Sequence, residues 1–315
     1  MSNFDFNKIK GAALAPMAGV ADSAFREICR SYGAVFTVTE MISAKALCFQ
    51  DKKSRELMRF TESERPCGIQ LFGSEPDIMA KAAKIAAEYE PDFIDINMGC
   101  PVPKVAGNGC GSALMRSPEL AGEIVKAVAA AVDLPVSVKI RKGWDNNSVN
   151  AVEIAKIAQE NGAAAVAVHG RTKAQGYAGD ADKEIIRRVR EALKIPVIAN
   201  GGIVDKQRFE EMKKATGCEI AMVARGALGN PFIFAEIAAG TPEPTVTERM
   251  ETMIGQCELT CERRGEKRGI LDCRKHAAWY IKGVQGAATF RKRAVVAKDL
   301  NELHMLANEI VEKCK

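Results

Sequence analysis

The chain has 315 residues, of which 47% are hydrophobic and 27% charged, with a formal net charge of +5. This composition is typical of a soluble globular protein with a sizeable core. No apolar run approaches the roughly 18 residues of a membrane span, and the segment from Met1 to Lys10 lacks a secretory signal pattern. We therefore expect a cytoplasmic protein without a membrane partner. Ten irregularly spaced cysteines and three scattered histidines predict reduced thiols and no metal site.

Eight short, mostly apolar runs predict strands at residues 12–18, 35–40, 68–72, 93–97, 136–140, 165–169, 197–200 and 220–224. Near-continuous apolar character is typical of parallel strands that are buried on both faces. Helical patterns occupy most of the intervening segments, for example 75–89, 118–131, 151–161 and 183–193. Eight alternating units predict an α/β fold, a (β/α)₈ TIM barrel. The alternative, an open doubly wound sheet, would require a Gly-x-Gly-x-x-Gly turn that the first strand lacks.

The segment 238–248 carries two prolines and a glycine and is predicted to be a linker. It divides the chain into a barrel domain at 1–240 and a small all-helical C-terminal domain at 241–315. Between Arg263 and Arg293, ten lysines and arginines face only Glu266 and Asp272, a net charge of +8. Such a concentration of positive charge favours a polyanionic partner, a nucleic acid, over a solvated helix face.

Polar residues follow the predicted strands at their carboxyl ends, which form the active face of this fold. Gly201–Gly202 and Arg225 follow the last two strands, the usual phosphate site. Lys139 at a strand end requires an anionic or electron-rich partner, and the amide of Gln70 suits the edge of a heterocycle. Together these residues predict a flat, phosphorylated cofactor across the barrel mouth, FMN. Taken alone, each of these residues could also have an ordinary structural role instead of binding a cofactor; His169 is an example.

Cys100 lies in the run Asp-Ile-Asn-Met-Gly-Cys-Pro at residues 95–101. The run follows a strand pattern, and Pro101 forces a turn because its ring fixes φ. The thiol is therefore expected at the tip of a strand, close to the amide of Asn97. A thiol of ordinary pKa, about 8.5, is mostly protonated at neutral pH and can donate a proton. The alternative is a small buried hydrophobic residue.

The chain resembles the bacterial tRNA-dihydrouridine synthases, most closely their B-type branch, from about residue 10 to 300. The resemblance rests on the motifs at residues 15–20, 70–73, 95–101, 139–144, 169–172, 200–203, 225–226 and 274–283. The chain departs from the family pattern at two positions. Ala21 stands where the family often has threonine, and Cys110 is an extra thiol that would substitute for Cys100 or oxidise with it.

The resemblance implies that FMN, reduced by NADPH or NADH, passes a hydride to C6 of a uridine in tRNA while Cys100 protonates C5. The residues expected to bind FMN are Pro16, Met17, Ala18, Gln70, Lys139, His169, Asn200, Gly201, Gly202, Ala224 and Arg225. Asn97 and Arg141 would contact the uracil or its phosphates. The helical domain would bind tRNA through basic side chains, namely Arg274, Lys275, Lys282, Arg291, Lys292 and Arg293.

Two alternative functions stay open. A flavin barrel could act on a free pyrimidine, as dihydroorotate dehydrogenases do, or the barrel could be the scaffold of a non-catalytic RNA-binding protein. Trp279 and Tyr280 are either stacking groups for bases or core aromatics of the helical domain.

Overall fold

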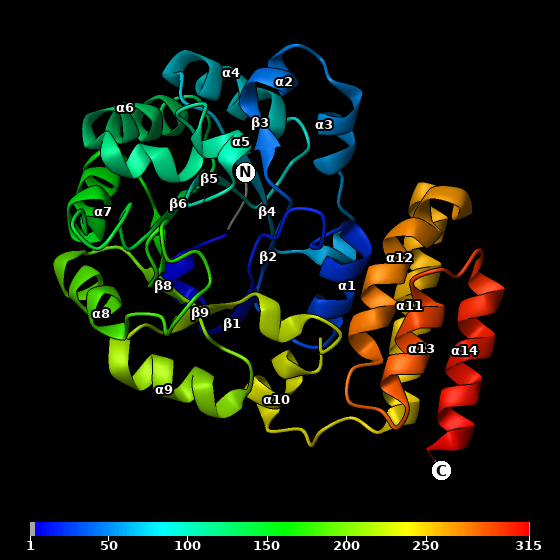
Figure 1. Ribbon diagram of the computed structural model, residues 1–315. Helices are drawn as coiled ribbons and strands as arrows, with labels where there is room; N and C mark the ends of the chain where they lie inside the picture. The colour runs from blue at the N-terminus through cyan, green and yellow to red at the C-terminus, as the bar shows by residue number, and fades with distance from the viewer. Residues whose placement is uncertain (1–3, 315) are drawn as a thin grey trace.

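The computed structural model describes residues 4–314, and its sheet closes into a barrel of parallel strands surrounded by helices (Figure 1). Around the barrel the order is β1, β9, β8, β7, β6, β5, β4 and β2. Backbone hydrogen bonds from Leu14 to Phe36 (3.1 Å) and from Val35 to Ala12 (2.8 Å) close the ring. The predicted TIM barrel is therefore confirmed.

The barrel strands are β1 (Gly11–Leu14), β2 (Thr37–Val38), β4 (Cys67–Phe72), β5 (Phe93–Met98), β6 (Val136–Arg141), β7 (Ala165–His169), β8 (Val197–Asn200) and β9 (Ile220–Val223). An unpredicted two-residue strand, β3 (Ile42–Ser43), also pairs with β4. The strands are apolar on both faces because helices cover the outside and side chains fill the inside, as expected of a parallel barrel.

The helices of the barrel are α1 (Ser23–Ser31), α2 (Ala44–Cys48), α3 (Lys52–Leu57), α4 (Pro76–Ala87), α5 (Pro103–Ala106), α6 (Pro118–Ala129), α7 (Ala151–Glu160), α8 (Lys183–Ala192), α9 (Lys206–Thr216) and α10 (Ile233–Ala239). Several start where the sequence predicts. Pro76 and Pro118 occupy first turns, and the carboxylates of Asp182 and Asp205 cap α8 and α9.

One end of the barrel is closed by aromatic side chains. Phe6, in the 3₁₀ turn η1 (Phe6–Lys8), packs edge-on against Phe36 and Phe93 with ring centroids 5.9 and 4.9 Å apart. Phe4 stacks on Phe93 from the same side, at 5.0 Å. Because these residues precede or begin their strands, they seal the amino-terminal end. The opposite, carboxyl end is left for polar side chains.

Four helices after residue 245 form a helical unit with a core of its own: α11 (Val246–Arg264), α12 (Glu266–Tyr280), α13 (Ala287–Ala294) and α14 (Leu300–Lys313). Figure 1 shows it beside α1. Gly240, with φ of 69°, ends α10, and a capping box of Thr245 and Glu248 starts α11. Tyr280 is a core residue of this unit, since it is fully buried and its hydroxyl donates to Gln256 (2.9 Å).

The helical unit packs directly against the barrel. At Gly229, where φ is 64°, a Cβ atom would stand 2.3 Å from the backbone carbon of Trp279 in α12. Nearby, the hydroxyl groups of Tyr32 and Thr252 are 2.8 Å apart. Only glycine fits at this junction. Within residues 4–314, none of the helices has the length and apolar character needed to cross a membrane.

Candidate functional site

Polar side chains form a layer inside the barrel just below its carboxyl end. On β5, Ile94 and Ile96 pack outward against helices, so alternation turns Asp95 and Asn97 inward. The sheet register places Gln70 of β4 beside Asp95, and Ser137 of β6 on the other side of it. These side chains are buried, and each therefore requires a hydrogen-bond partner.

Hydrogen bonds join this layer into a chain. Gln70 Nε2 donates to Asp95 Oδ2 (2.6 Å), and Asn97 Nδ2 donates to Gln70 Oε1 (2.8 Å). Ser137 Oγ donates to the other carboxylate oxygen of Asp95 (2.5 Å). Burial raises the pKa of Asp95 to about 6, while these donors oppose that rise.

Cys100 lies on the turn that follows β5, where it is half-buried. Asn97 Oδ1 accepts the backbone N–H groups of Gly99 (3.1 Å) and Cys100 (2.9 Å). The Cys100 carbonyl accepts from Ser112 N in η3 (Gly111–Arg116) at 3.0 Å. Burial raises the pKa of the Cys100 thiol, so the group stays protonated at neutral pH. The turn thus holds a thiol suited to donate a proton.

Lys139 and Asn200 lie at the same end of the barrel, on β6 and β8. Lys139 Nζ donates to Asn200 Oδ1 (3.1 Å), and Asn200 Nδ2 donates to the carbonyl of Met222 (2.9 Å). Burial, with a smaller contribution from the charge of nearby Arg141, lowers the pKa of Lys139 to about 8. Because the hydrogen-bond partner of this ammonium group is a neutral amide, the site favours an additional anion.

Arg141 stabilises the loops of the mouth through backbone carbonyls. Its Nε donates to Gly99 (2.7 Å), and its Nη1 donates to Thr172 (2.9 Å) and Gly176 (3.0 Å). The first of these bonds links β6 to the turn of Cys100. Arg141 therefore has a structural task in addition to the substrate contact that the sequence predicts.

His169, at the end of β7, is a neutral imidazole. Its Nε2 lies 3.1 Å from Nη1 of Arg171, and because arginine only donates, Nε2 must accept. Burial lowers the pKa of His169 to about 2, and the charges of Lys139, Arg141, Arg171 and Arg225 act in the same direction. Its remaining proton is thus on Nδ1.

Tyr177, in the loop after β7, is a site residue that the sequence reasoning missed. Its side chain is 57% exposed, and its ring centroid lies 4.7 Å from the Arg225 guanidinium and 5.8 Å from that of Arg141. An aromatic residue between Gly176 and Gly179 at the mouth of a barrel was the available signal. The contacts are cation–π interactions that connect the ends of β6 and β9.

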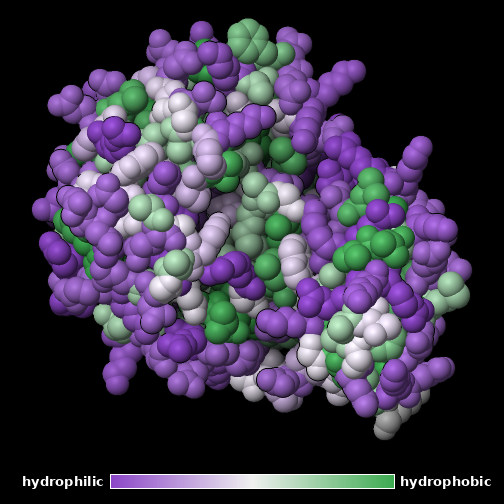
Figure 2. Space-filling model, viewed as in Figure 1, coloured by the Kyte–Doolittle hydropathy of each residue, from purple (hydrophilic) through white to green (hydrophobic). Residues whose placement is uncertain are grey.

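The other predicted cofactor residues also lie at the carboxyl ends of strands. Pro16, Met17 and Ala18 form the loop after β1, which is held by bonds from Val20 and Ala21 to the Met17 carbonyl. The remaining members follow β8 and β9, namely Gly201, Gly202, Ala224 and Arg225. Figure 2, viewed as in Figure 1, shows this face of the barrel hollowed near its axis.

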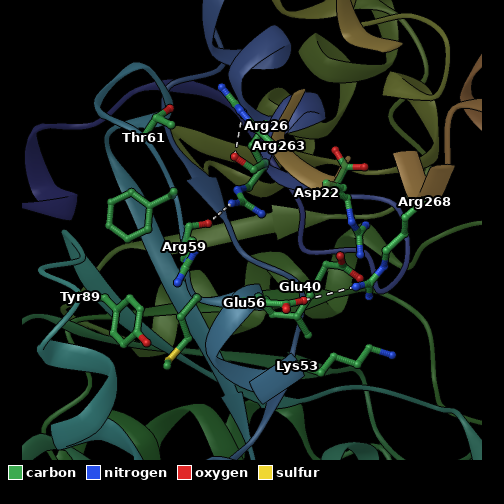
Figure 3. A pocket seen from close by; sticks show the side chains of 15 residues that line it. Asp22, Arg26, Glu40, Lys53, Glu56, Arg59, Thr61, Tyr89, Arg263 and Arg268 are labelled. Carbon is green, nitrogen blue, oxygen red and sulfur yellow. Dashed lines mark hydrogen bonds and ion pairs between the residues drawn. The ribbon is translucent and has the colours of Figure 1, made fainter. Parts of the chain in front are cut away.

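A second feature is a cavity of about 560 Å³ between the barrel and the helical unit, here called the junction cavity (Figure 3). Its lining residues are Asp22, Ser23, Arg26, Glu40, Lys53, Glu56, Leu57, Met58, Arg59, Phe60, Thr61, Tyr89, Arg263, Arg264 and Arg268. Arg268 and Glu56 form an ion pair across it, at 3.5 Å. Cationic side chains outnumber carboxylates in this lining, so its net charge is positive.

The predicted RNA contacts lie on the helical unit, outside the lining of the junction cavity, and differ in availability. Lys275 pairs with Asp272 (3.1 Å) and Arg293 with Glu309 (2.6 Å), while Arg274 Nε donates to a carbonyl of its own unit. Lys282, Arg291, Lys292 and Arg293 are exposed, and of these four only Arg293 belongs to an ion pair within residues 4–314.

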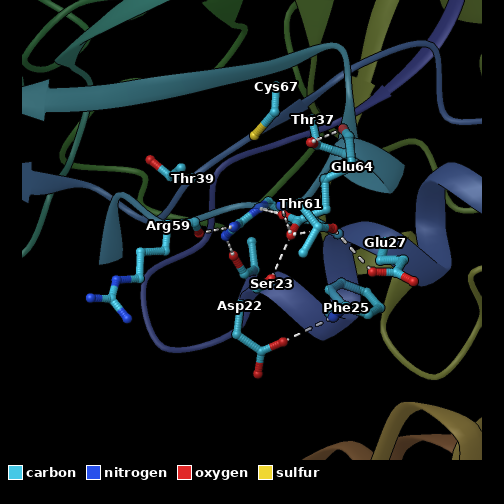
Figure 4. Close-up of polar contacts among 12 residues, drawn as sticks. Asp22, Ser23, Phe25, Glu27, Thr37, Thr39, Arg59, Thr61, Glu64 and Cys67 are labelled. Atoms are coloured by element: carbon cyan, nitrogen blue, oxygen red, sulfur yellow. Dashed lines mark hydrogen bonds and ion pairs between the residues drawn. The ribbon is translucent and has the colours of Figure 1, made fainter. Parts of the chain in front are cut away.

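A buried ion pair supports the barrel side of the junction cavity (Figure 4). Arg26 Nε of α1 donates to Glu64 Oε2 (2.7 Å), and both side chains are almost completely buried. Ser23 Oγ and the Thr61 N–H donate to the other oxygen of Glu64, at 2.5 and 2.9 Å. Because the carboxylate has several donors, its burial is compensated.

Comparison with known proteins identifies the family. The family model described as dihydrouridine synthase (Dus) matches residues 13–314. A tRNA-dihydrouridine synthase B of Vibrio parahaemolyticus is 42% identical over 285 residues, which is 89% of this chain and 88% of that protein. A probable tRNA-dihydrouridine synthase of Rickettsia prowazekii is 39% identical over 293 residues, 91% of this chain and 90% of that protein.

Among solved structures, histamine dehydrogenase from Rhizobium sp. 4-9 superposes with a TM-score of 0.60 at 12% identity, over 98% of this chain and 63% of that protein. At this identity the likeness concerns the fold alone. Within residues 4–314, no cluster of three or more His, Cys, Asp or Glu side chains is arranged to hold a metal ion. The family match and the relatives confirm the resemblance read from the motifs: the chain belongs to the dihydrouridine synthase family.

Proposed function

We propose that this chain reduces the C5=C6 bond of uridine in tRNA to 5,6-dihydrouridine, with bound FMN as cofactor and NADPH or NADH as reductant. The family assignment and the names of the relatives support the reaction and the substrate. The observation that carries the proposal in this chain is the Cys100 thiol on the turn after β5, whose backbone N–H donates to Asn97 and whose pKa is raised by burial, at the end of the barrel where Lys139 also lies.

The residues at the mouth fit FMN. Gly202 has φ of 77° and open space where a Cβ atom would stand, so a phosphate can approach its backbone. Arg225 is exposed next to it on η4 (Arg225–Ala227) and supplies a cation. Lys139 is the cation available to the electron-rich ring, and Gln70 supplies amide groups for a ring edge. The cofactor would be held by these groups and the loop of residues 16–18.

When bound and reduced, FMN supplies the hydride that adds to C6 of the uracil ring. Addition at C6 leaves a carbanion-like C5, and the Cys100 thiol donates the proton that completes the new C5–H bond. The thiolate then recovers its proton from solvent. His169 is neutral and Asn97 is an amide, so neither side chain supplies an acidic proton that would compete with the Cys100 thiol.

A uridine must leave its stack to enter the barrel, which costs a few kcal/mol. Phosphate contacts to lysines and arginines of the helical unit offset that cost, because each contact releases counterions from the RNA. Exposed Lys282, Arg291 and Lys292 are available for such contacts. The orientation of the helical unit relative to the mouth would then select the uridine.

The test is reduction of a tRNA transcript by the full chain, with FMN and NADPH, followed by mass-spectrometric detection of a uridine nucleoside heavier by two hydrogens. Free uridine and orotate serve as competing substrates. Product in tRNA alone supports the proposal. Turnover of a free pyrimidine without tRNA product would instead assign the chain to the dihydroorotate-type alternative, and RNA binding without any flavin reduction would leave a binding protein.

Lys139→Met tests the cofactor site separately. The substitution keeps the length of the side chain and removes the ammonium group, so flavin absorbance that co-purifies with the protein should fall. Lys156→Met on α7 is the matched control and should retain its flavin. Equal flavin content in the two variants would refute the role of Lys139.

A further inference from the structure

Two side-chain amides connect a buried carboxylate to the backbone of Cys100. Asp95 accepts from Gln70, Gln70 accepts from Asn97, and Asn97 accepts from the N–H groups of Gly99 and Cys100. This chain of hydrogen bonds crosses from β5 to β4, returns to β5 and ends on the turn of Cys100. Its start, Asp95, is 1% exposed, and its two carboxylate oxygens accept from Gln70 and Ser137 inside the barrel.

The direction of these bonds is imposed by the carboxylate of Asp95 at one end and matches the backbone donors of Gly99 and Cys100 at the other. An ionised carboxylate has acceptors and no donor, so the amide of Gln70 must turn its nitrogen toward Asp95. Its oxygen then faces Asn97, whose amide must in turn present nitrogen to Gln70 and oxygen to the turn. Were the amides reversed, Asn97 Nδ2 would face the N–H groups of Gly99 and Cys100, which are also donors. Two hydrogen bonds of the turn would then be lost.

Ser137 has a different part in the arrangement. Its hydroxyl donates to the second oxygen of Asp95, the oxygen that does not contact Gln70. At a pH well above 6, removal of this hydroxyl leaves Asp95 ionised, and the direction of the amides is therefore unchanged. Ser137 thus offers a control substitution at the same depth and on the neighbouring strand.

We infer that Asp95 is a positioning residue, which orients the amides of Gln70 and Asn97 and thereby fixes the turn that presents the Cys100 thiol. The inference deepens the proposed function, since it rests on Cys100 as proton donor. It assigns no contact between Asp95 and the uracil. Its task is to make the catalytic turn rigid from inside the barrel.

The experiment measures alkylation of individual cysteines by iodoacetamide in the full chain, by peptide mass spectrometry and without any turnover. Half-buried Cys100 reacts when its turn opens, so its rate should rise at least about fivefold, the effect of losing one of the two hydrogen bonds of the turn. Asp95→Asn, which has nearly the same shape but can donate, should give this increase. Half-buried Cys48 and Cys314 lie outside the chain of bonds and should react at wild-type rates.

A double-mutant cycle separates positioning from general loosening of the barrel. If Asp95 acts through Asn97, Asp95→Asn should add no further increase in the Asn97→Ala background. Ser137→Ala should keep the wild-type rate at Cys100. Additive effects of Asp95→Asn and Asn97→Ala, or an unchanged rate in Asp95→Asn, would overturn the inference.

If Asp95→Asn does not fold, Gln70→Ala tests the same inference, because it interrupts the chain of hydrogen bonds at the member that follows Asp95. It should raise Cys100 alkylation as well, and a wild-type rate there would also refute the inference. With tRNA as substrate, Asp95→Asn should lower kcat while leaving KM unchanged. Since alkylation needs neither flavin nor tRNA, its outcome is independent of whether the proposed reaction is correct.

Discussion

Arg263 at the end of α11 donates a hydrogen bond to Ser23 of α1, with 2.7 Å between Nη1 and Oγ, although 240 positions separate them in sequence. The same guanidinium pairs with Glu27 and lies 3.7 Å from the buried carboxylate of Glu64. One side chain thus links the helical unit to the ion pair of Arg26 and Glu64 inside the barrel wall.

Arg263→Ala should therefore lower the free energy of unfolding by about 2 kcal/mol, since it removes charge-assisted hydrogen bonds at a mostly buried position. Chemical denaturation measures the change. Lys267→Ala, at an exposed position on α12, is the control and should change the unfolding free energy by less than about 0.5 kcal/mol. Equal midpoints for both variants would show that Arg263 does not stabilise the contact between the two units.

Arg26→Met should be more severe, because it leaves the carboxylate of Glu64 buried without its cation. The expected loss of unfolding free energy is about 3–5 kcal/mol. Arg187→Met, which breaks exposed ion pairs with Glu184 and Glu191, should cost less than about 1 kcal/mol. A small effect of Arg26→Met would mean that water reaches Glu64 in the variant.

Cys100→Ala should lower the rate of dihydrouridine formation by about 10²- to 10⁴-fold, which is the usual contribution of a general acid. Flavin binding and its reduction by NADPH should persist, as an absorbance assay can show. Cys110→Ala is the control, because that thiol is directed at the carbonyl of Asn108 (3.5 Å) and should be dispensable. Loss of turnover in Cys110→Ala with activity in Cys100→Ala would reverse the assignment.

The two buried histidines should remain neutral from about pH 8 to 5.5, as nitrogen NMR shifts of their rings can show. Burial lowers the pKa of His169 to about 2 and that of His276 to about 4. Because both values lie below the unfolded value of about 6.5, the unfolded chain binds more protons in acid. The free energy of unfolding should thus fall as pH drops below about 6.5. Titration of either ring near pH 6.5 would contradict this expectation.

Binding of tRNA should depend steeply on salt through the exposed cations. Replacement of Lys282, Arg291 and Lys292 by Ala should reduce the slope of log affinity against log salt by about two to three. Replacement of Arg293, which already pairs with Glu309, should have a smaller effect. An unchanged slope in the triple variant would place the RNA elsewhere, for instance at the junction cavity.

Much of the barrel could be predicted from sequence because β5 to β9 are apolar runs between turn signals. The predicted strand at 12–18 was too long, since β1 ends at Leu14, shortly before Pro16. The two residues of β3 are too few to show a period, so that strand was missed. The segment between β2 and β4 contains two short helices instead of the single crossover helix of a regular unit.

Within the candidate site, the sequence indicated which end of the barrel carries the polar side chains but not how these side chains pair. Asp95 and Ser137 are polar positions inside strands, and their contact depends on a register between strands that no local pattern encodes. Likewise, net charge predicted a polyanion partner but could not show which cations are neutralised. Arg263 and Arg264 belong to the basic stretch, yet both form ion pairs within the protein.

The glycine at position 229, against which the backbone of Trp279 rests, has a consequence for substrate choice. Close contact at this point leaves little room for a hinge, so the fold would set the distance from the basic helices to the thiol. An RNA of constant shape that binds at one end of this distance would present the same nucleotide at the other end each time. Selection of a single position would then follow from measurement along the tRNA rather than from reading of its bases.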